Sequence, residues 1–150
     1  MKQAELMNFN EYGFLPVPPA CHEVDLADLP GVFANSVTRS SQWRCLCSFF
    51  EHLRSHTSIR SVYLDGEFVS AADDPEIVEV GIELHDGVTR DELAALEQPF
   101  TDEWGIEVNF YAPRRPDRYN FHESFQRPEP SLGVRDLPDD FRKGYLKIRI

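Results

Sequence analysis

The sequence predicts a small α/β domain, with a mixed β-sheet and helices packed mainly on one face. Two observations carry this prediction: some stretches alternate apolar and polar residues at strand spacing, and one stretch repeats apolar residues at helical spacing. The 150 residues suit a single domain, residues 1–150, with one hydrophobic core. The predicted order is helix, strand, strand, helix, strand, loop, strand, which a sheet covered by helices would satisfy.

The chain starts with a segment that favours no regular structure. Residues 9–34, "FNEYGFLPVPPACHEVDLADLPGVFA", are rich in proline and aromatic residues. We therefore predict an irregular lead-in over residues 1–34 that wraps around the domain, with a short helical turn after Asp25.

A helix over residues 37–56 comes next, because its apolar residues recur at i, i+3, i+4 and i+7. These residues are Trp43, Leu46, Cys47, Phe50 and Leu53. Asn35 or Ser36 can cap its start. The following residues 58–64, "SIRSVYL", predict a strand that ends at Asp65-Gly66.

The clearest strand pattern covers residues 77–84. One face would carry Val78, Val80, Ile82 and Leu84, and the other Ile77, Glu79, Gly81 and Glu83. We expect the valine face to be buried together with Trp43, and Glu79 to face a groove. Asp86-Gly87 then predicts a turn.

The next helix is predicted from a capping box, in which Thr89 and Glu92 bond each other's backbone N–H groups. This helix would end before Pro99, and residues 105–112 alternate again as a strand.

Residues 113–140 contain five prolines and predict a long loop, with a short helix near 120–126. The last residues, "GYLKIRI" (144–150), alternate as a closing strand.

The charge of the chain argues against general nucleic-acid binding. Residues 1–100 carry the whole net charge of −11, whereas residues 101–150 hold equal numbers of acidic and basic side chains. An acidic surface repels phosphate backbones and also serves solubility. No apolar run is long enough to cross a bilayer and the first residues lack signal-peptide features, so we expect a cytoplasmic protein that does not bind membranes.

Cysteine and histidine give no metal site by pattern. Three cysteines form no disulfide framework, which is typical of a reducing compartment. His52 and His56 are spaced i, i+4 and could clasp a metal on one helix face, but no third ligand lies nearby in the sequence. We therefore expect no metal here.

The segment "YLDGEFV", a five-residue turn and "PEIVEVGIEL" resemble the core of minimal nucleotidyltransferases of the polymerase-beta type. The lead-in, the strand "GIEVNFYAP" and the final "KGYLKIRI" resemble an uncharacterised bacterial branch of that superfamily. In the superfamily, a glycine and a serine bind the nucleotide phosphates, and three acids hold two magnesium ions. The resemblance thus implies a nucleotidyltransferase-like fold.

The residues matching this motif imply a degenerate site. Gly66 matches the phosphate-binding glycine, but Glu67 replaces the serine, so a vestigial phosphate turn is expected at these two positions. Ile77 replaces the first acid and Glu79 keeps the second. The third acid corresponds to Glu107 or to Asn109, which share a strand face, so alternation does not choose between them.

Two functions follow from the resemblance. The first is a catalytically inactive binding or regulatory subunit, which needs neither magnesium nor a nucleoside triphosphate and has a protein partner encoded nearby, as in toxin–antitoxin or phage-defence systems. The second is a divergent nucleotidyltransferase that modifies a protein or RNA, with Glu67, Glu79 and Glu107 as catalytic residues. Magnesium would then bind Glu79 and Glu107. We expect no catalytic or metal-binding residues under the first.

The long loop is the predicted partner-binding segment. Its composition, rich in arginine and aromatic residues, is common at protein interfaces. The candidate contacts are Arg114, Arg115, Arg118, Tyr119 and Phe121. The arginines fit a solvated loop equally well.

Overall fold

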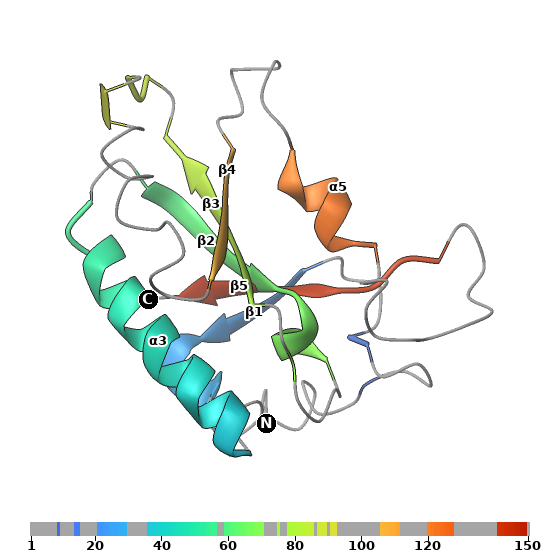
Figure 1. The fold of residues 1–150 in the computed structure, drawn as a ribbon. Coiled ribbons are helices and arrows are strands. Elements are labelled where there is room, and N and C mark those ends of the chain that lie inside the picture. Colours follow the sequence, from blue (N-terminus) through green and yellow to red (C-terminus); the bar gives the residue numbers. More distant parts are fainter. Residues whose placement is uncertain are drawn as a thin grey trace.

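In the computed structural model the chain folds around one five-stranded mixed sheet (Figure 1). The structure describes residues 9, 14–15, 21–29, 36–56, 59–70, 75, 78–85, 87–89, 91–92, 106–111, 120–127 and 141–149, with only the backbone of Glu67. The strands are β1 (Cys21–Asp25), β2 (Ile59–Asp65), β3 (Glu79–Leu84), β4 (Glu107–Tyr111) and β5 (Tyr145–Arg149). The helices are α3 (Val37–Leu53), α5 (Phe121–Phe125) and the 3-10 turns η1 (Leu26–Asp28) and η2 (Glu67–Val69).

The strand order in the sheet is β1-β5-β2-β3-β4. β2 is antiparallel to both of its neighbours, β3 and β5, whereas β1 pairs in parallel with β5 and β4 in parallel with β3. The predicted α/β class with a mixed sheet is therefore confirmed.

α3 covers one face of the sheet and forms the main core with it. Ser36 caps the helix by accepting the backbone N–H of Arg39 at 3.2 Å, which selects Ser36 over Asn35. The buried residues of this core include Leu46, Phe49, Phe50, Leu53, Val62, Leu64, Val78, Val80, Ile82, Leu84, Leu146 and Ile148. The predicted strand register is thus correct, but Trp43 packs at the edge of the core and is only partly buried.

α5 packs on the opposite face of the sheet, as Figure 1 shows. A second cluster there consists of Tyr63, Phe121, Phe125 and Tyr145, with Cys21 and Tyr111 at its border. The prediction that helices pack mainly on one face is therefore wrong for the described helices. The reason is that Phe121 and Phe125 give α5 an apolar side, which the aromatic residues of β2 and β5 can bury.

The lead-in also contains a strand that the sequence did not reveal. β1 occupies residues 21–25 of the segment predicted to be irregular, and the helical turn expected after Asp25 is present as η1. Val24 is the one fully buried residue of β1, so apolar alternation is absent. β1 is a strand because it pairs with β5 over five residues, from Cys21↔Tyr145 to Asp25↔Arg149.

The Thr89–Glu92 capping box is formed: each side chain accepts the other residue's backbone N–H at 3.1 Å. Gly87 has φ 87° in the predicted turn, a conformation that glycine adopts readily. The rest of that helix, and residues 113–119 and 128–140 of the long loop, lie outside the described residues. Within the described part of the chain, no helix is long and apolar enough to span a membrane.

We predict that Gly81→Ala destabilises the protein by about 1–3 kcal/mol, because a Cβ at this position would overlap the Phe121 ring. Urea denaturation measures the free energy of unfolding.

The control is a double-mutant cycle with Phe121→Ala, which alone costs about 3–5 kcal/mol by leaving a cavity. The double variant should lose clearly less than the sum of the two, since the smaller side chain leaves room for the new methyl group. Additive losses would contradict the close packing of α5 on Gly81.

Candidate functional site

The turn at Gly66, where the sequence predicts a vestigial phosphate turn, has a conformation that favours glycine. Gly66 has φ 88° and is buried, so a residue with a Cβ would be strained there. The Val69 N–H donates to the Gly66 carbonyl at 3.0 Å and closes the turn. The sequence therefore placed the turn correctly.

Arg39 of α3 holds this turn from the core side, a role the sequence analysis missed. It is 3% exposed, and its guanidinium donates to the carbonyls of Phe68 at 2.6 Å and Ser70 at 2.7 Å. The guanidinium also lies 5.5 Å from the centre of the Phe68 ring, in cation–π range. No local pattern signals the role, because these contacts join residues about thirty positions apart.

Three acidic residues are aligned across the sheet next to the turn. In the register of the strands, Asp65 pairs with Glu79, and Glu79 pairs with Glu107. Directly paired residues point to the same face of a sheet, so these three share the face that α5 covers. Asn109 pairs instead with Gly81. The structure thus places Glu107, not Asn109, beside Glu79.

The three acids differ in exposure. Asp65 is buried, Glu79 is partly buried and Glu107 is exposed. The buried carboxylate forms an ion pair with the buried Lys143 ammonium, which also donates to the Phe125 carbonyl at 2.6 Å. A cation therefore already compensates the carboxylate closest to Gly66. The sequence pattern predicts Asp65 only as part of a turn and does not indicate its pairing with Lys143, because the two are 78 positions apart.

Of the other predicted site residues, the structure describes the side chain of Phe121 alone. The Glu67 side chain, Ile77, Arg114, Arg115, Arg118 and Tyr119 lie outside the described residues. Phe121 is fully buried against Tyr63 and Gly81, so its ring is not accessible to a partner, and we correct that prediction. A phenylalanine at the start of a short amphipathic helix is buried because its own sheet offers an apolar surface.

Among the described residues, no group of three His, Cys, Asp or Glu side chains is placed to hold a metal. The Nε2 atoms of His52 and His56 lie 3.3 Å apart. Burial, and secondarily the neighbouring His52, lowers the pKa of His56, so this pair is poor at holding two protons at once.

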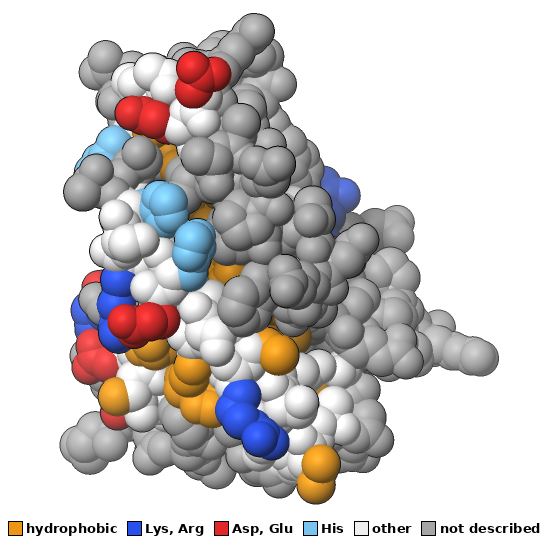
Figure 2. Space-filling model, turned by 60° about the vertical axis from the view of Figure 1, so that its left-hand side comes forward, with side chains coloured by type: hydrophobic (Ala, Val, Ile, Leu, Met, Phe, Trp, Pro, Cys, Tyr) orange, Lys and Arg blue, Asp and Glu red, His pale blue; other side chains and the backbone are white. Residues whose placement is uncertain are grey.

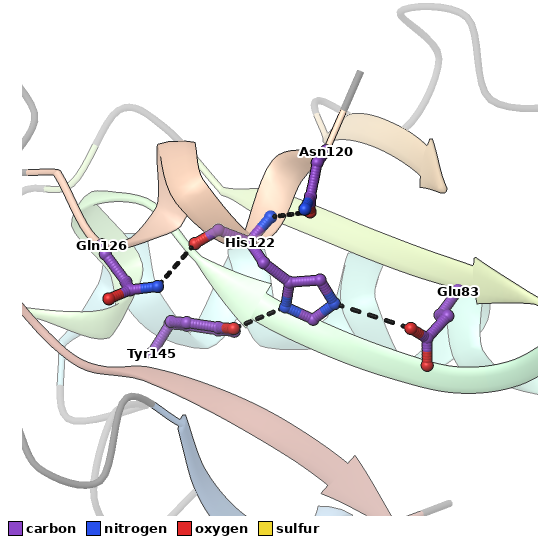
Figure 3. Close-up of polar contacts among 5 residues, drawn as sticks. All are labelled: Glu83, Asn120, His122, Gln126 and Tyr145. Atoms are coloured by element: carbon purple, nitrogen blue, oxygen red, sulfur yellow. Dashed lines mark hydrogen bonds and ion pairs between the residues drawn. The ribbon is translucent and has the colours of Figure 1, made fainter. Parts of the chain in front are cut away.

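A second group of polar residues on this face surrounds the His122 side chain of α5 (Figure 3). The Nδ1 atom of His122 is 2.5 Å from the Tyr145 hydroxyl oxygen, and its Nε2 atom is 3.8 Å from a Glu83 carboxylate oxygen. Asn120 caps α5 by accepting the His122 backbone N–H at 3.0 Å. α5, β3 and β5 thus meet at one imidazole.

Both imidazole nitrogens of His122 are engaged. Burial is the main cause that raises the pKa of Tyr145, so the phenol stays protonated and donates to Nδ1, which leaves the Nε2–H facing Glu83. Burial also lowers the pKa of His122, partly opposed by Glu83. With no free lone pair, the ring fastens α5 to the sheet and cannot act as a base or ligand without breaking a contact.

A family model matches residues 7–149, nearly the whole chain. The chain belongs to this family of unknown function, DUF6932. No curated protein and no solved structure matches it.

We predict that Lys143→Met lowers the free energy of unfolding by about 3–5 kcal/mol, because it leaves the Asp65 carboxylate buried without its cation. Urea denaturation at pH 7 measures the loss, and adding Asp65→Asn should recover part of it.

The matched control is Lys147→Met, the same change at a partly exposed position on β5, four residues later, which should cost less than about 1 kcal/mol. Equal losses in the two single variants would contradict a special role for the buried pair.

We predict that acidification loosens α5. The folded-state pKa of His122 lies below the ordinary value of about 6.5, so its contribution to stability is complete above that pH. The contribution is lost as the pH falls through the lowered value, because the imidazolium cannot accept from Tyr145. Hydrogen exchange of residues 121–127, corrected for intrinsic rates, should show less protection at pH 5.5 than at pH 7.5.

His122→Gln is the control, since its side chain does not titrate in this range. Its exchange in α5 should be faster at both pH values and nearly independent of pH. A variant that kept the pH dependence of the native chain would assign the effect to another group.

Proposed function

We propose that this chain is a nucleotidyltransferase-like protein with a degenerate catalytic site that acts as a binding or regulatory subunit. Its partner would be a cytoplasmic protein encoded by a neighbouring gene, in a toxin–antitoxin or phage-defence system. The site needs neither magnesium nor a nucleoside triphosphate for this role. The family carries no assigned activity, so the geometry of the site is the basis of the proposal.

The observation that carries the proposal is the position of α5. In an active enzyme of this type, nucleotide and metals would lie on the sheet face that carries the acids. Here Gly81, two residues after Glu79 on that face, is in contact with the Phe121 ring, and Phe125 fills the space toward Tyr145. Aromatic side chains therefore occupy space beside Glu79 that a ligand would need.

The charge of the acid row supports the same proposal. Two magnesium ions in such a site need carboxylates that converge and are free to coordinate. Asp65 is buried and already paired with Lys143, while Glu107 is exposed on the edge strand β4. The pairing of Asp65 leaves two acids of the row for metal ions, which supports a site that does not work by two-metal catalysis.

One observation favours the alternative, a divergent nucleotidyltransferase. The register brings Glu79 and Glu107 side by side at the end of the sheet nearest Gly66. In this alternative Glu67, Glu79 and Glu107 are catalytic, and magnesium and a nucleoside triphosphate are the cofactor and substrate.

A transfer assay separates the two functions. The purified chain is incubated with Mg²⁺ and a labelled nucleoside triphosphate, with and without the purified product of the neighbouring gene. We expect label incorporation at background, because the Asp65 carboxylate is already paired with Lys143 and Phe121 covers the sheet face at Gly81. Glu79→Gln should leave the biological activity of the chain largely intact, and so should Glu123→Gln, a matched control on the exposed side of α5.

Magnesium-dependent transfer that Glu79→Gln abolishes and Glu123→Gln preserves would overturn the proposal in favour of the enzyme. Partner binding is tested separately by replacing Arg114, Arg115 and Arg118 with glutamine, which should weaken the complex. Unchanged partner affinity would show that these arginines form a solvated loop.

A further inference from the structure

A pocket of about 470 Å³ opens at the opposite end of β2 from Gly66. It lies between the end of α3, the start of β2 and the end of β5, and its lining includes Leu53, Ile59, Val62 and Ile148. The β2–β5 register ends at Val62 and Ile148, and the β2–β3 register shifts between Ile59 and Ser61. The pocket exists because the strands stop pairing there.

The lining of this pocket is basic. It contains Arg54, His56, Arg60, Lys147 and Arg149, and no carboxylate of a described residue contributes to it. The whole chain has a net charge of −11, yet four of its 15 Lys and Arg residues line this one pocket. Low-dielectric walls focus such a field and attract anions.

Two of these cations have no carboxylate partner among the described residues. Arg54 pairs with Glu51 at 2.8 Å, and Arg149 pairs with Asp25 at 2.6 Å and Glu23 at 3.2 Å. Neither Arg60 nor Lys147 forms an ion pair with any side chain that the structure describes. These two cations therefore remain available to an anionic ligand.

Figure 2 looks onto the side of the molecule that is on the left in Figure 1. Histidine side chains lie next to each other there, and basic side chains lie against acidic ones below them. The ion pairs of Arg54 and Arg149 place carboxylates beside the pocket, which favours a small anion over a long polyanion.

We propose that this pocket binds a phosphorylated small molecule. Arg60 and Lys147 would contact the phosphate, since guanidinium and ammonium groups form strong charge-assisted hydrogen bonds to it. The apolar floor formed by Leu53, Ile59 and Ile148 would receive the organic part of the ligand. The volume is that of a typical small-molecule site, and the pocket is separate from the acid row, so this binding needs neither Glu79 nor magnesium.

Isothermal titration calorimetry of the full chain in EDTA at 50 mM NaCl tests the proposal, with AMP, adenosine and inorganic triphosphate as probes. AMP should bind and adenosine should not, because only AMP carries the anion. Tighter binding of AMP than of triphosphate supports an organic phosphate as the ligand, whereas the reverse order overturns the role of the apolar floor and with it the proposal. Raising the salt concentration should weaken either binding.

The variant Arg60→Gln/Lys147→Gln should lose at least about tenfold in affinity, because two charge-assisted contacts are removed. The control Arg44→Gln/Arg127→Gln makes the same change of charge at exposed positions outside the pocket and should change affinity less than about threefold. Glu79→Gln should leave binding unchanged.

The proposal is overturned if neither phosphate probe binds, or if the two double variants weaken binding equally, which would indicate general charge attraction alone. It is also overturned if Glu79→Gln abolishes binding, since the phosphate would then lie at the acid row. Matching thermal unfolding curves for the two double variants exclude misfolding as the cause of a loss.

Discussion

The buried ammonium of Lys143 holds together parts of the chain that are far apart in sequence. It pairs with Asp65 at the end of β2 and donates to the Phe125 carbonyl at the end of α5. The Lys143 backbone N–H donates to the Gln126 carbonyl and the Gly144 N–H to the Leu15 carbonyl, both at 2.8 Å. A buried cation is costly unless fully paired, so all these elements must be in place together. The Lys143 ammonium therefore joins α5 to the end of β2 beside Gly66, and the next residue, Gly144, joins the same segment to the lead-in.

The same turn is fixed from the opposite side by a second buried cation. Arg39 reaches up from α3 to the carbonyls of Phe68 and Ser70, while Lys143 reaches Asp65 from the other face. In an enzyme, cations beside a phosphate-binding turn would face the ligand. Here Arg39 binds the carbonyl oxygens of Phe68 and Ser70, and Lys143 binds the carboxylate of Asp65. Both cations therefore stabilise the turn itself.

The sequence predicts the elements whose packing is local and periodic. Alternation along β3 and the apolar stripe of α3 are sufficient to place these two elements, and the predicted capping box at Thr89 is formed. It could not predict β1, because that strand depends on pairing with β5, about 120 residues later. The sequence pattern also could not predict the Asp65–Lys143 ion pair or the position of α5. Both depend on contacts between segments that are far apart in the chain.

At the candidate site, the motif identified the glycine turn and Glu79, and strand register then chose Glu107 as its neighbour. The motif could not show that the sheet face beyond Glu79 is filled, because Phe121 reaches Gly81 from a helix forty residues later. A glycine at this position is needed for that close approach, not for a ligand. Sequence matching therefore overstates how open the site is.

The two ends of β2 carry opposite charges, acidic side chains at one end and basic side chains at the other. The strand ends at Asp65 beside Glu79, whereas Arg60 near its start lies in the basic pocket. At about 3.3 Å per residue, the seven residues of β2 keep these ends roughly 20 Å apart. That distance exceeds the screening length at physiological salt, so the acidic end does not cancel the field of the pocket. The anion proposed for the basic pocket would therefore bind independently of the carboxylates at the other end of β2.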